Sequence, residues 1–185
     1  MNNLQIEKIL SRVYISKDNE NFLGVFPADK IPSEAELANH SGFSIILNTQ
    51  PSGRPGIHWV AIFRKNKTEP LEYFDSFGRR PHIKHFLKFF NGKKFVYNNI
   101  PVQSIFTDVC GQYCIFFILA RHFDISYFEI VKLFFEKGDN FVRKFINDYF
   151  SLDLQNYDID FPEKQISICP QKKNKKKRKK SERYD

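Results

Sequence analysis

The chain has 185 residues, a hydrophobic fraction of 42% and 21 phenylalanines, enough apolar material for one compact domain with a buried core. This composition excludes a wholly disordered protein, and no apolar run reaches the roughly 20 residues of a membrane-spanning helix. The first residues (MNNLQIEKIL) lack the features of a secretory signal, so we expect a soluble intracellular protein without membrane association. Cys110, Cys114 and Cys169 are too few and too unevenly spaced for a disulfide framework or a closed zinc site, and we predict no metal site.

The net charge of +8 is concentrated at the C-terminus. Nine of the 29 Lys and Arg residues and two of the 21 Asp and Glu residues lie between Pro170 and Asp185, so this segment carries +7. We therefore divide the chain into a folded domain over residues 1–165 and a disordered, lysine-rich tail over residues 166–185. The tail is a nuclear-localisation signal, an arm that neutralises nucleic-acid phosphates, or a solubilising segment without a partner. The candidate nucleic-acid contacts are Lys172, Lys173, Lys175, Lys176, Lys177, Arg178, Lys179 and Lys180.

The first third of the chain predicts helices followed by a strand. Apolar residues at helical spacing predict a helix over Leu4–Tyr14. Residues 33–36 (SEAE) have the form of a capping box and open a second, short helix. GFSIIL at 42–47 predicts a buried strand, and PSGRPG at 51–56 predicts a loop.

The middle of the chain predicts a hairpin, a helix and a further strand. Strand-like runs at 57–64 and 71–77 are joined by the polar segment KNKTEP, which favours an antiparallel hairpin. Pro81 and Gly92 bracket an apolar helical pattern, and KFVYNNI at 94–100 is another strand candidate.

The last third predicts buried helices. Residues 110–123 are apolar enough for a buried helix, capped by Thr107 or Asp108. Helical patterns continue over 127–150 with a break at Gly138, after which Asp139 can cap the next helix. Strands in the middle with helices before and after predict an α+β fold, with a central mixed or antiparallel sheet packed by helices.

His58 and Asp75 are candidates for a catalytic pair. If the predicted hairpin is centred on its polar connection, the two residues lie opposite each other, where Cβ atoms are about 4.5–5.5 Å apart. An Asp that holds one imidazole nitrogen fixes the tautomer and stabilises the imidazolium. A half-exposed polar His at the start of a strand is the alternative reading.

Cys110 is the candidate nucleophile because it stands where a loop becomes a helix. Unpaired N–H groups and the helix dipole favour a thiolate there, and Gly111 leaves room for a substrate backbone. Cys110 and Cys114 could instead be small core residues of an apolar helix, the reading we favour for Cys114. Gln103 is the candidate oxyanion donor, because a side-chain amide can share this role with the backbone N–H of the nucleophile.

These residues resemble the motifs of the adenovirus maturation protease (adenain) family, which has relatives in virophages and Maverick/Polinton elements. The matching segments are GIHWVAIF, EYFDSFG and PVQSIFTDVCGQYC, within residues 56–120. The family pattern is His-Trp, an acidic residue 17 positions later, then Gln, and Cys-Gly seven positions after the Gln. Both spacings recur here, from His58 to Asp75 and from Gln103 to Cys110.

The resemblance implies Cys110 as nucleophile at the start of a central helix, His58 as its base, Asp75 as the residue that orients His58, and Gln103 as an oxyanion donor. Trp59 would pack beside the site. The implied reaction is peptide-bond hydrolysis through a thioester acyl-enzyme, next to small residues such as Gly, by an enzyme that needs no cofactor for chemistry. The implied substrates are capsid and core precursors, processed by a monomer in the virion or in the nucleus or viral factory of the host cell.

Two departures from the family pattern keep alternatives open. The acidic residue is Asp75, as in the SUMO-specific proteases, whereas adenovirus enzymes carry Glu, so a protease for ubiquitin-like modifiers is the runner-up. Adenovirus enzymes are activated by DNA and by a disulfide-linked peptide. Here Gly92 stands in the corresponding region without a cysteine, which argues against a covalent link. A non-enzymatic, basic DNA-binding protein is the third hypothesis.

Overall fold

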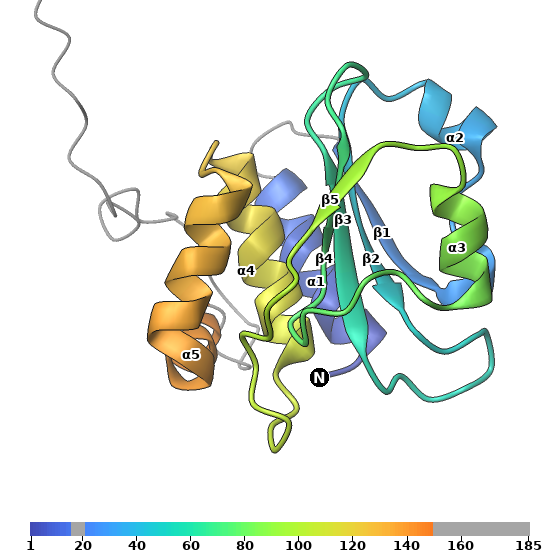
Figure 1. Ribbon diagram of the computed structural model, residues 1–185. Helices are drawn as coiled ribbons and strands as arrows, with labels where there is room; N and C mark the ends of the chain where they lie inside the picture. Colours follow the sequence, from blue (N-terminus) through green and yellow to red (C-terminus); the bar gives the residue numbers. More distant parts are fainter. Residues whose placement is uncertain (16–20, 150–185) are drawn as a thin grey trace, which may run out of the picture.

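The computed structural model describes residues 1–15 and 21–149. The predicted tail over 166–185, with its basic residues, and the last part of the predicted domain lie outside the described residues. Within them the chain forms an α+β fold around one five-stranded sheet (Figure 1).

The chain begins with one helix, continues with strands that alternate with short helices, and ends with two further helices. In chain order they are α1 (Asn3–Ile15), β1 (Phe22–Pro27), the 3₁₀ turn η1 (Ala28–Lys30), α2 (Glu34–Ala38), β2 (Phe43–Asn48), β3 (Trp59–Arg64), β4 (Leu71–Phe74), α3 (Lys84–Phe90), β5 (Phe95–Tyr97), α4 (Cys110–His122) and α5 (Tyr127–Tyr149). The spatial order of the strands is the sequence order, β1-β2-β3-β4-β5. The outer pairs β1–β2 and β4–β5 are parallel and the inner pairs are antiparallel, so the sheet is mixed, as predicted.

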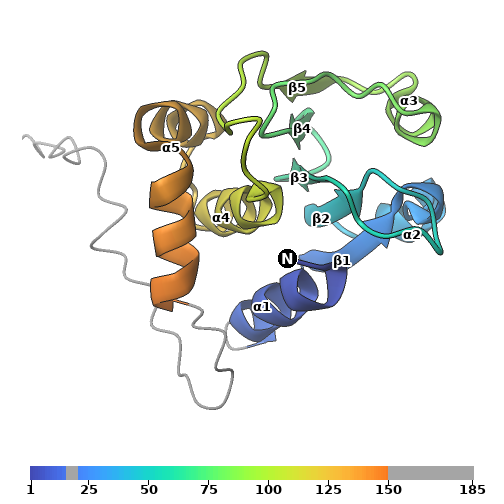
Figure 2. The ribbon, with the colours of Figure 1, turned by 90° about the horizontal axis from the view of Figure 1, so that it is seen from below.

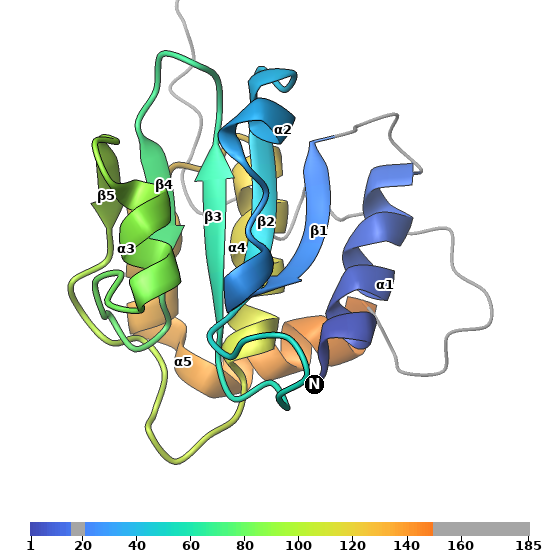
Figure 3. The same ribbon diagram turned by 90° about the vertical axis from the view of Figure 1, so that its right-hand side faces the viewer.

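Helices cover both faces of this sheet. Figure 2 shows α1, α4 and α5 on one face and α2 and α3 on the other, and Figure 3 shows α4 behind the strands when α2 and α3 are in front. A sheet covered on both faces buries most side chains of its inner strands. All six residues of β2 are accordingly buried.

Alternation along the strands divides the core into two parts. Ile46, Ala61 and Phe74 point to the face covered by α4, whereas their neighbours Ile45, Ile62 and Tyr73 point to the face covered by α3. Helix α4 lies between the sheet and α5, and residues 115–120 are almost completely buried around its circumference. A helix that is apolar on all sides belongs in such a central position.

Most predicted elements are present, including the capping box of α2 at Ser33 and Glu36. The predicted hairpin forms, but its register is wrong by two residues. Ala61 pairs with Phe74, which places Phe77 rather than Asp75 opposite His58. A shift of two residues keeps each side chain on the same face of the sheet, so His58 and Asp75 remain diagonal neighbours.

Two predicted helix caps are wrong. The residue before α4 is Val109, and neither Thr107 nor Asp108 caps this helix. The break in α5 does occur at Gly138, but the Asp139 carboxylate contacts the loop before α4. No helix within residues 1–15 and 21–149 has the length and apolar character needed to cross a bilayer.

Candidate active site

The four candidate residues come from three segments that meet at one edge of the sheet, the edge where β3 starts and β4 ends. His58 immediately precedes β3, and Asp75 immediately follows β4. Because these strands are antiparallel, the start of one lies beside the end of the other. Helix α4 begins at Cys110 near the same edge, which is the lower edge of the sheet in Figure 3.

His58 and Asp75 form a buried pair. Nε2 of His58 donates to Oδ1 of Asp75 at 2.8 Å, and the two residues are 8% and 1% exposed. The ring of Phe77, the cross-strand neighbour of His58, lies 4.8 Å from the imidazole. A carboxylate on one nitrogen and an aromatic ring on one side leave the imidazole a single orientation.

Asp75 is itself held by hydrogen bonds to its backbone and side chain. The side chain of Asn98 accepts from the Asp75 N–H at 3.0 Å and donates to the Asp75 carbonyl at 2.6 Å. The backbone N–H of Phe77 donates to Oδ1 at 2.9 Å, beside the bond from His58. The carboxylate therefore points at the imidazole because the chain around it is fixed.

Cys110 lies close enough to His58 to affect its pKa. Nδ1 is buried and has no hydrogen-bond partner of regular geometry within the described residues, and the Cys110 thiol interacts with the ring. Cys110 is 4% exposed and is the first residue of α4, where the N–H groups of the first turn have no partner in the helix. These N–H groups and an imidazolium both stabilise negative charge on sulfur.

The pKa of His58 is shifted by opposing effects. Burial alone lowers it, because a charged ring loses water. The hydrogen bond to Asp75, the interaction with Cys110 and the negative charges of both outweigh burial, and they raise the pKa from 6.5 to about 9. A pKa of about 9 favours the imidazolium form of His58 at neutral pH.

Gln103 is buried in the loop that leads to α4, and both ends of its amide are engaged. The Ser76 hydroxyl donates to Oε1 at 2.6 Å, which directs Nε2 the opposite way. Nε2 donates to the Thr107 carbonyl at 2.8 Å. Nε2 also lies 3.4 Å from Oγ1 of Thr107, a longer contact than the one to the carbonyl.

Trp59 and Gly111 contribute to packing beside the site. Trp59 is 6% exposed, and its Nε1 donates to Oδ1 of Asn3 at 2.6 Å, which ties α1 to β3. A Cβ on Gly111 would lie 3.1 Å from Cδ1 of Ile6. The glycine thus makes room for α1.

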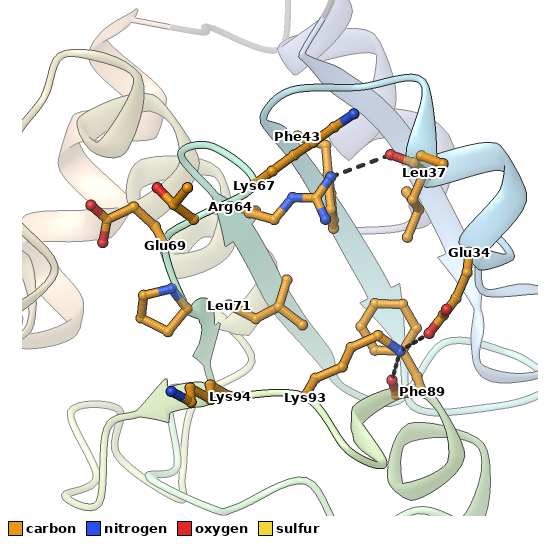
Figure 4. Close-up of a pocket in the computed structure, with 13 residues that line it drawn as sticks. Glu34, Leu37, Phe43, Arg64, Lys67, Glu69, Leu71, Phe89, Lys93 and Lys94 are labelled. Carbon is orange, nitrogen blue, oxygen red and sulfur yellow. Dashed lines mark hydrogen bonds and ion pairs between the residues drawn. The ribbon is translucent and has the colours of Figure 1, made fainter.

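A groove on the other face of the sheet is separate from this site. Leu37, Phe43, Leu71 and Phe89 form its apolar part, and none of the four candidate residues lines it (Figure 4). No group of three or more His, Cys, Asp or Glu residues with the geometry to hold a metal ion is found in the described ranges.

Comparisons with known proteins point to one group of enzymes. No protein-family model matches the chain. The chain is 35% identical over 102 residues to the cysteine protease S273R of African swine fever virus, covering 48% of this chain and 37% of S273R. It is 26% identical over 136 residues to the protease of ovine adenovirus D serotype 7, covering 64% of each chain. The chain is a relative of these viral cysteine proteases.

The fold agrees with this relationship. The crystal structure of the S273R protease superposes with a TM-score of 0.55 at 22% identity, covering 77% of this chain and 64% of the other. The predicted resemblance to adenain-like viral cysteine proteases and the α+β fold are both confirmed. The sequence match spans less than two thirds of either viral protease.

Sequence reasoning missed several side chains that hold the candidate residues of this viral protease relative. Ser76 orients Gln103, Asn98 holds Asp75, and Asp139 accepts from Thr107 Oγ1 at 2.7 Å. Each pair is separated by 23 to 32 positions in the chain. The only local signal was that Ser76 follows Asp75 and Thr107 lies within the Gln103–Cys110 segment.

Proposed function

We propose that this chain is a viral cysteine endopeptidase in which Cys110, His58, Asp75 and Gln103 carry the reaction. The observation that supports the proposal is the buried His58, whose Nε2 is bonded to Asp75 and whose ring interacts with the Cys110 side chain. This arrangement assigns a base, a residue that orients the base, and a nucleophile at a helix start.

The first half of the reaction acylates Cys110. The Cys110 thiolate, paired with the His58 imidazolium, attacks the carbonyl carbon of the scissile peptide bond. The negative charge that develops on the carbonyl oxygen is stabilised by the backbone N–H of Cys110 and by the Gln103 amide, which exchanges its long contact with Thr107 Oγ1 for the oxyanion. The imidazolium then protonates the leaving amine, the C–N bond breaks, and a thioester remains.

The second half restores the enzyme. The neutral imidazole takes a proton from a water molecule, whose oxygen attacks the thioester carbonyl. The same donors stabilise the second oxyanion. The C–S bond breaks, the carboxylic acid leaves, and the thiolate–imidazolium pair is regenerated. Asp75 stabilises the imidazolium throughout and keeps Nε2–H directed away from the substrate.

The proposed substrates are capsid and core precursors cut next to small residues such as glycine. S273R and the adenovirus protease, the viral relatives, support a viral protein substrate. A ubiquitin-like modifier remains the second candidate, because the acidic residue is Asp75 and a further relative is named "SUMO-1 cysteine protease S273R".

The decisive experiment compares the cleavage of virion proteins by wild type, Cys110→Ala and Cys114→Ala, using mass spectrometry of new chain ends. Cleavage by wild type and by Cys114→Ala, with none by Cys110→Ala, is the expected result. Persistent cleavage by Cys110→Ala would rule out the assigned nucleophile. Rapid reaction with a modifier-derived covalent probe, without cleavage of virion proteins, would favour the modifier-specific alternative.

Thiol labelling gives a second test of the assignment. Iodoacetamide is expected to modify Cys110 before Cys114, because Cys114 is fully buried and its burial raises the pKa of its thiol. Peptide mapping separates the two positions from Cys169. Equal or faster labelling of Cys114 would contradict the proposed site.

A further inference from the structure

We propose that Asp139 is a positioning residue for the oxyanion site, because its carboxylate holds the loop that carries Gln103 and leads to Cys110. This inference rests on the proposed function, since it assigns Asp139 a part in that reaction. Asp139 is 29 residues beyond Cys110 in the chain. It reaches the loop because of a break in α5.

The break is caused by Gly138. Its φ of 64° and ψ of −167° lie in a region that is essentially restricted to glycine, so α5 consists of two helices that meet at this residue. Asp139 is the first residue after the break. In a continuous helix the chain would keep its direction at residue 139. The break turns the chain, and the Asp139 carboxylate reaches the loop before α4.

Both oxygens of Asp139 bind that loop or the helix it enters. Oδ2 accepts from Thr107 Oγ1 at 2.7 Å and from the Ser104 N–H at 3.2 Å. Oδ1 lies 2.9 Å from the hydroxyl of Tyr113, which also lies 2.8 Å from the Val102 carbonyl. The pKa of Tyr113 is raised above its ordinary value by burial and by Asp139, so this hydroxyl stays protonated.

These contacts surround Gln103. Val102 precedes it, and Thr107 supplies the carbonyl that accepts from Nε2 of Gln103 at 2.8 Å. The Thr107 side chain is thus bonded to Asp139 while its carbonyl is bonded to the candidate oxyanion donor. Loss of the carboxylate would remove its hydrogen bonds to the Thr107 hydroxyl and the Ser104 N–H. The segment from Ser104 to Thr107, which fixes the direction of the Gln103 amide, would then be less restrained.

The second half of α5 touches the same loop at one further point. Nη2 of Arg143 lies 3.7 Å from Oδ1 of Asp108, a distance at which an exposed ion pair contributes little. The loop itself exposes Ile105 and Phe106, which are 76% and 91% exposed. These two side chains add no core packing, so the loop is held by hydrogen bonds, among them those to Asp139 and those from Val102 and Gln103 to the Ser76 carbonyl.

The test separates amide hydrolysis, which forms an oxyanion, from alkylation of Cys110, which does not. In Asp139→Ala we expect kcat for a cleaved peptide to fall at least tenfold. The upper limit is the roughly 10²- to 10³-fold loss expected when an oxyanion donor is removed outright. KM and the rate and pH profile of iodoacetamide labelling at Cys110 are expected to stay within twofold. Glu136→Ala, an exposed acidic residue of the same helix, is the matched control.

A double-mutant cycle tests the route through Thr107. Thr107→Val removes the hydroxyl, with its long 3.4 Å contact to Nε2 of Gln103, and keeps the carbonyl that accepts from Gln103 at 2.8 Å. If Asp139 acts through this hydroxyl, Asp139→Ala combined with Thr107→Val loses no more activity than Asp139→Ala alone. Additive losses would overturn the route, and a parallel fall of hydrolysis and alkylation in Asp139→Ala would show a purely structural role.

A readout without catalysis keeps this inference separate from the proposed function. In ¹⁵N-labelled protein, the side-chain amide signals of Gln103, assigned by their loss in Gln103→Glu, are expected to shift and exchange faster with solvent in Asp139→Ala. Unchanged signals would refute the positioning role even in an active enzyme. Absence of peptide cleavage by wild type, with shifted amide signals, would refute the function and leave the structural link standing.

Discussion

At the scale of single residues, opposing effects on the pKa of His58 determine which form of its ring is favoured. Burial removes water from the ring and favours its neutral form, but a carboxylate 2.8 Å from one nitrogen and a thiol against the ring favour the cation. The cation prevails, and the pKa rises to about 9. The pair with Asp75 therefore contributes to stability in full below pH 6.5, and this contribution is lost as the pH rises through about 9.

The pKa of His58 can be measured directly by NMR titration of its ring protons, assigned by their loss in His58→Gln. The expected midpoint in wild type is near pH 9. In Asp75→Asn it is expected to fall by at least about one unit, because the favourable charge is gone while the burial remains. Titration of wild-type His58 near 6.5 would contradict the ion pair.

Asn98 satisfies the backbone of Asp75 with a single buried side chain. Asn98→Ala leaves the Asp75 N–H and carbonyl without these partners, so we expect the free energy of unfolding to fall by about 1–3 kcal/mol. Labelling of Cys110 is expected to slow, because the carboxylate that orients His58 loses its support. Urea unfolding and labelling rates measure both effects. The neighbouring exposed Asn99→Ala is expected to change neither, and equal effects of the two variants would contradict the role of Asn98.

At the scale of elements, one ion pair joins α4 to β4. Arg121, near the end of α4, donates from Nε and Nη2 to the two carboxylate oxygens of Glu72 at 2.6 and 2.8 Å. Glu72 lies at the start of β4 and Asp75 just past its end, while Cys110 begins α4. The ion pair joins the end of α4 to the start of β4. Cys110 and Asp75 lie at the opposite ends of these two elements, at the same edge of the sheet.

Breaking this pair is expected to be costly. Glu72→Gln leaves the Arg121 guanidinium, only 8% exposed, without its counter-charge, and we expect the free energy of unfolding to fall by roughly 3–5 kcal/mol. Equilibrium urea unfolding measures the change. Glu136→Gln breaks an exposed pair with Lys132 and is expected to cost less than about 1 kcal/mol. Similar losses in the two variants would show that α4 does not depend on this contact.

Sequence patterns predicted the structural features that are determined by residues close together in the chain. The capping box at Ser33, the break at Gly138 and the apolar helix after Cys110 are all encoded within a few residues. The segment 22–27 was not predicted as a strand, since FLGVFP contains Gly and Pro and becomes β1 only by pairing with β2. The hairpin register was wrong for a similar reason, because the loop geometry and not the midpoint of the connection sets it.

The residues of the candidate site were predicted from the sequence only where their spacing along the chain is informative. His58, Asp75, Gln103 and Cys110 stand at informative spacings, and the structure places them near one edge of the sheet. Asn98, Ser76 and Asp139 act on partners more than 20 positions away, and nothing in their own neighbourhood indicates those partners. Tertiary hydrogen bonds of this kind become visible only when the chain is folded.

At the scale of the whole molecule, charge and candidate chemistry occupy different parts of the chain. The segment from Pro170 to Asp185 carries +7 of the net +8, whereas His58, Asp75, Gln103 and Cys110 belong to a part with nearly balanced charge. The proposed attraction to nucleic acid and the proposed hydrolysis of peptides are therefore expected to be separable. This separation predicts that the basic residues affect where the protein binds and not how fast Cys110 reacts.

Replacing the eight Lys and Arg residues between Lys172 and Lys180 by Gln tests this separation while keeping the chain length. Wild type is expected to bind duplex DNA without sequence preference. The logarithm of its affinity should fall with the logarithm of salt concentration at a slope of at most about −7, because each neutralised phosphate contributes about −0.9. The substituted protein is expected to lose most of this affinity and slope, with iodoacetamide labelling of Cys110 unchanged. Undiminished DNA affinity would place the nucleic-acid contacts elsewhere on the molecule, and slower labelling would show that the basic segment acts on the site.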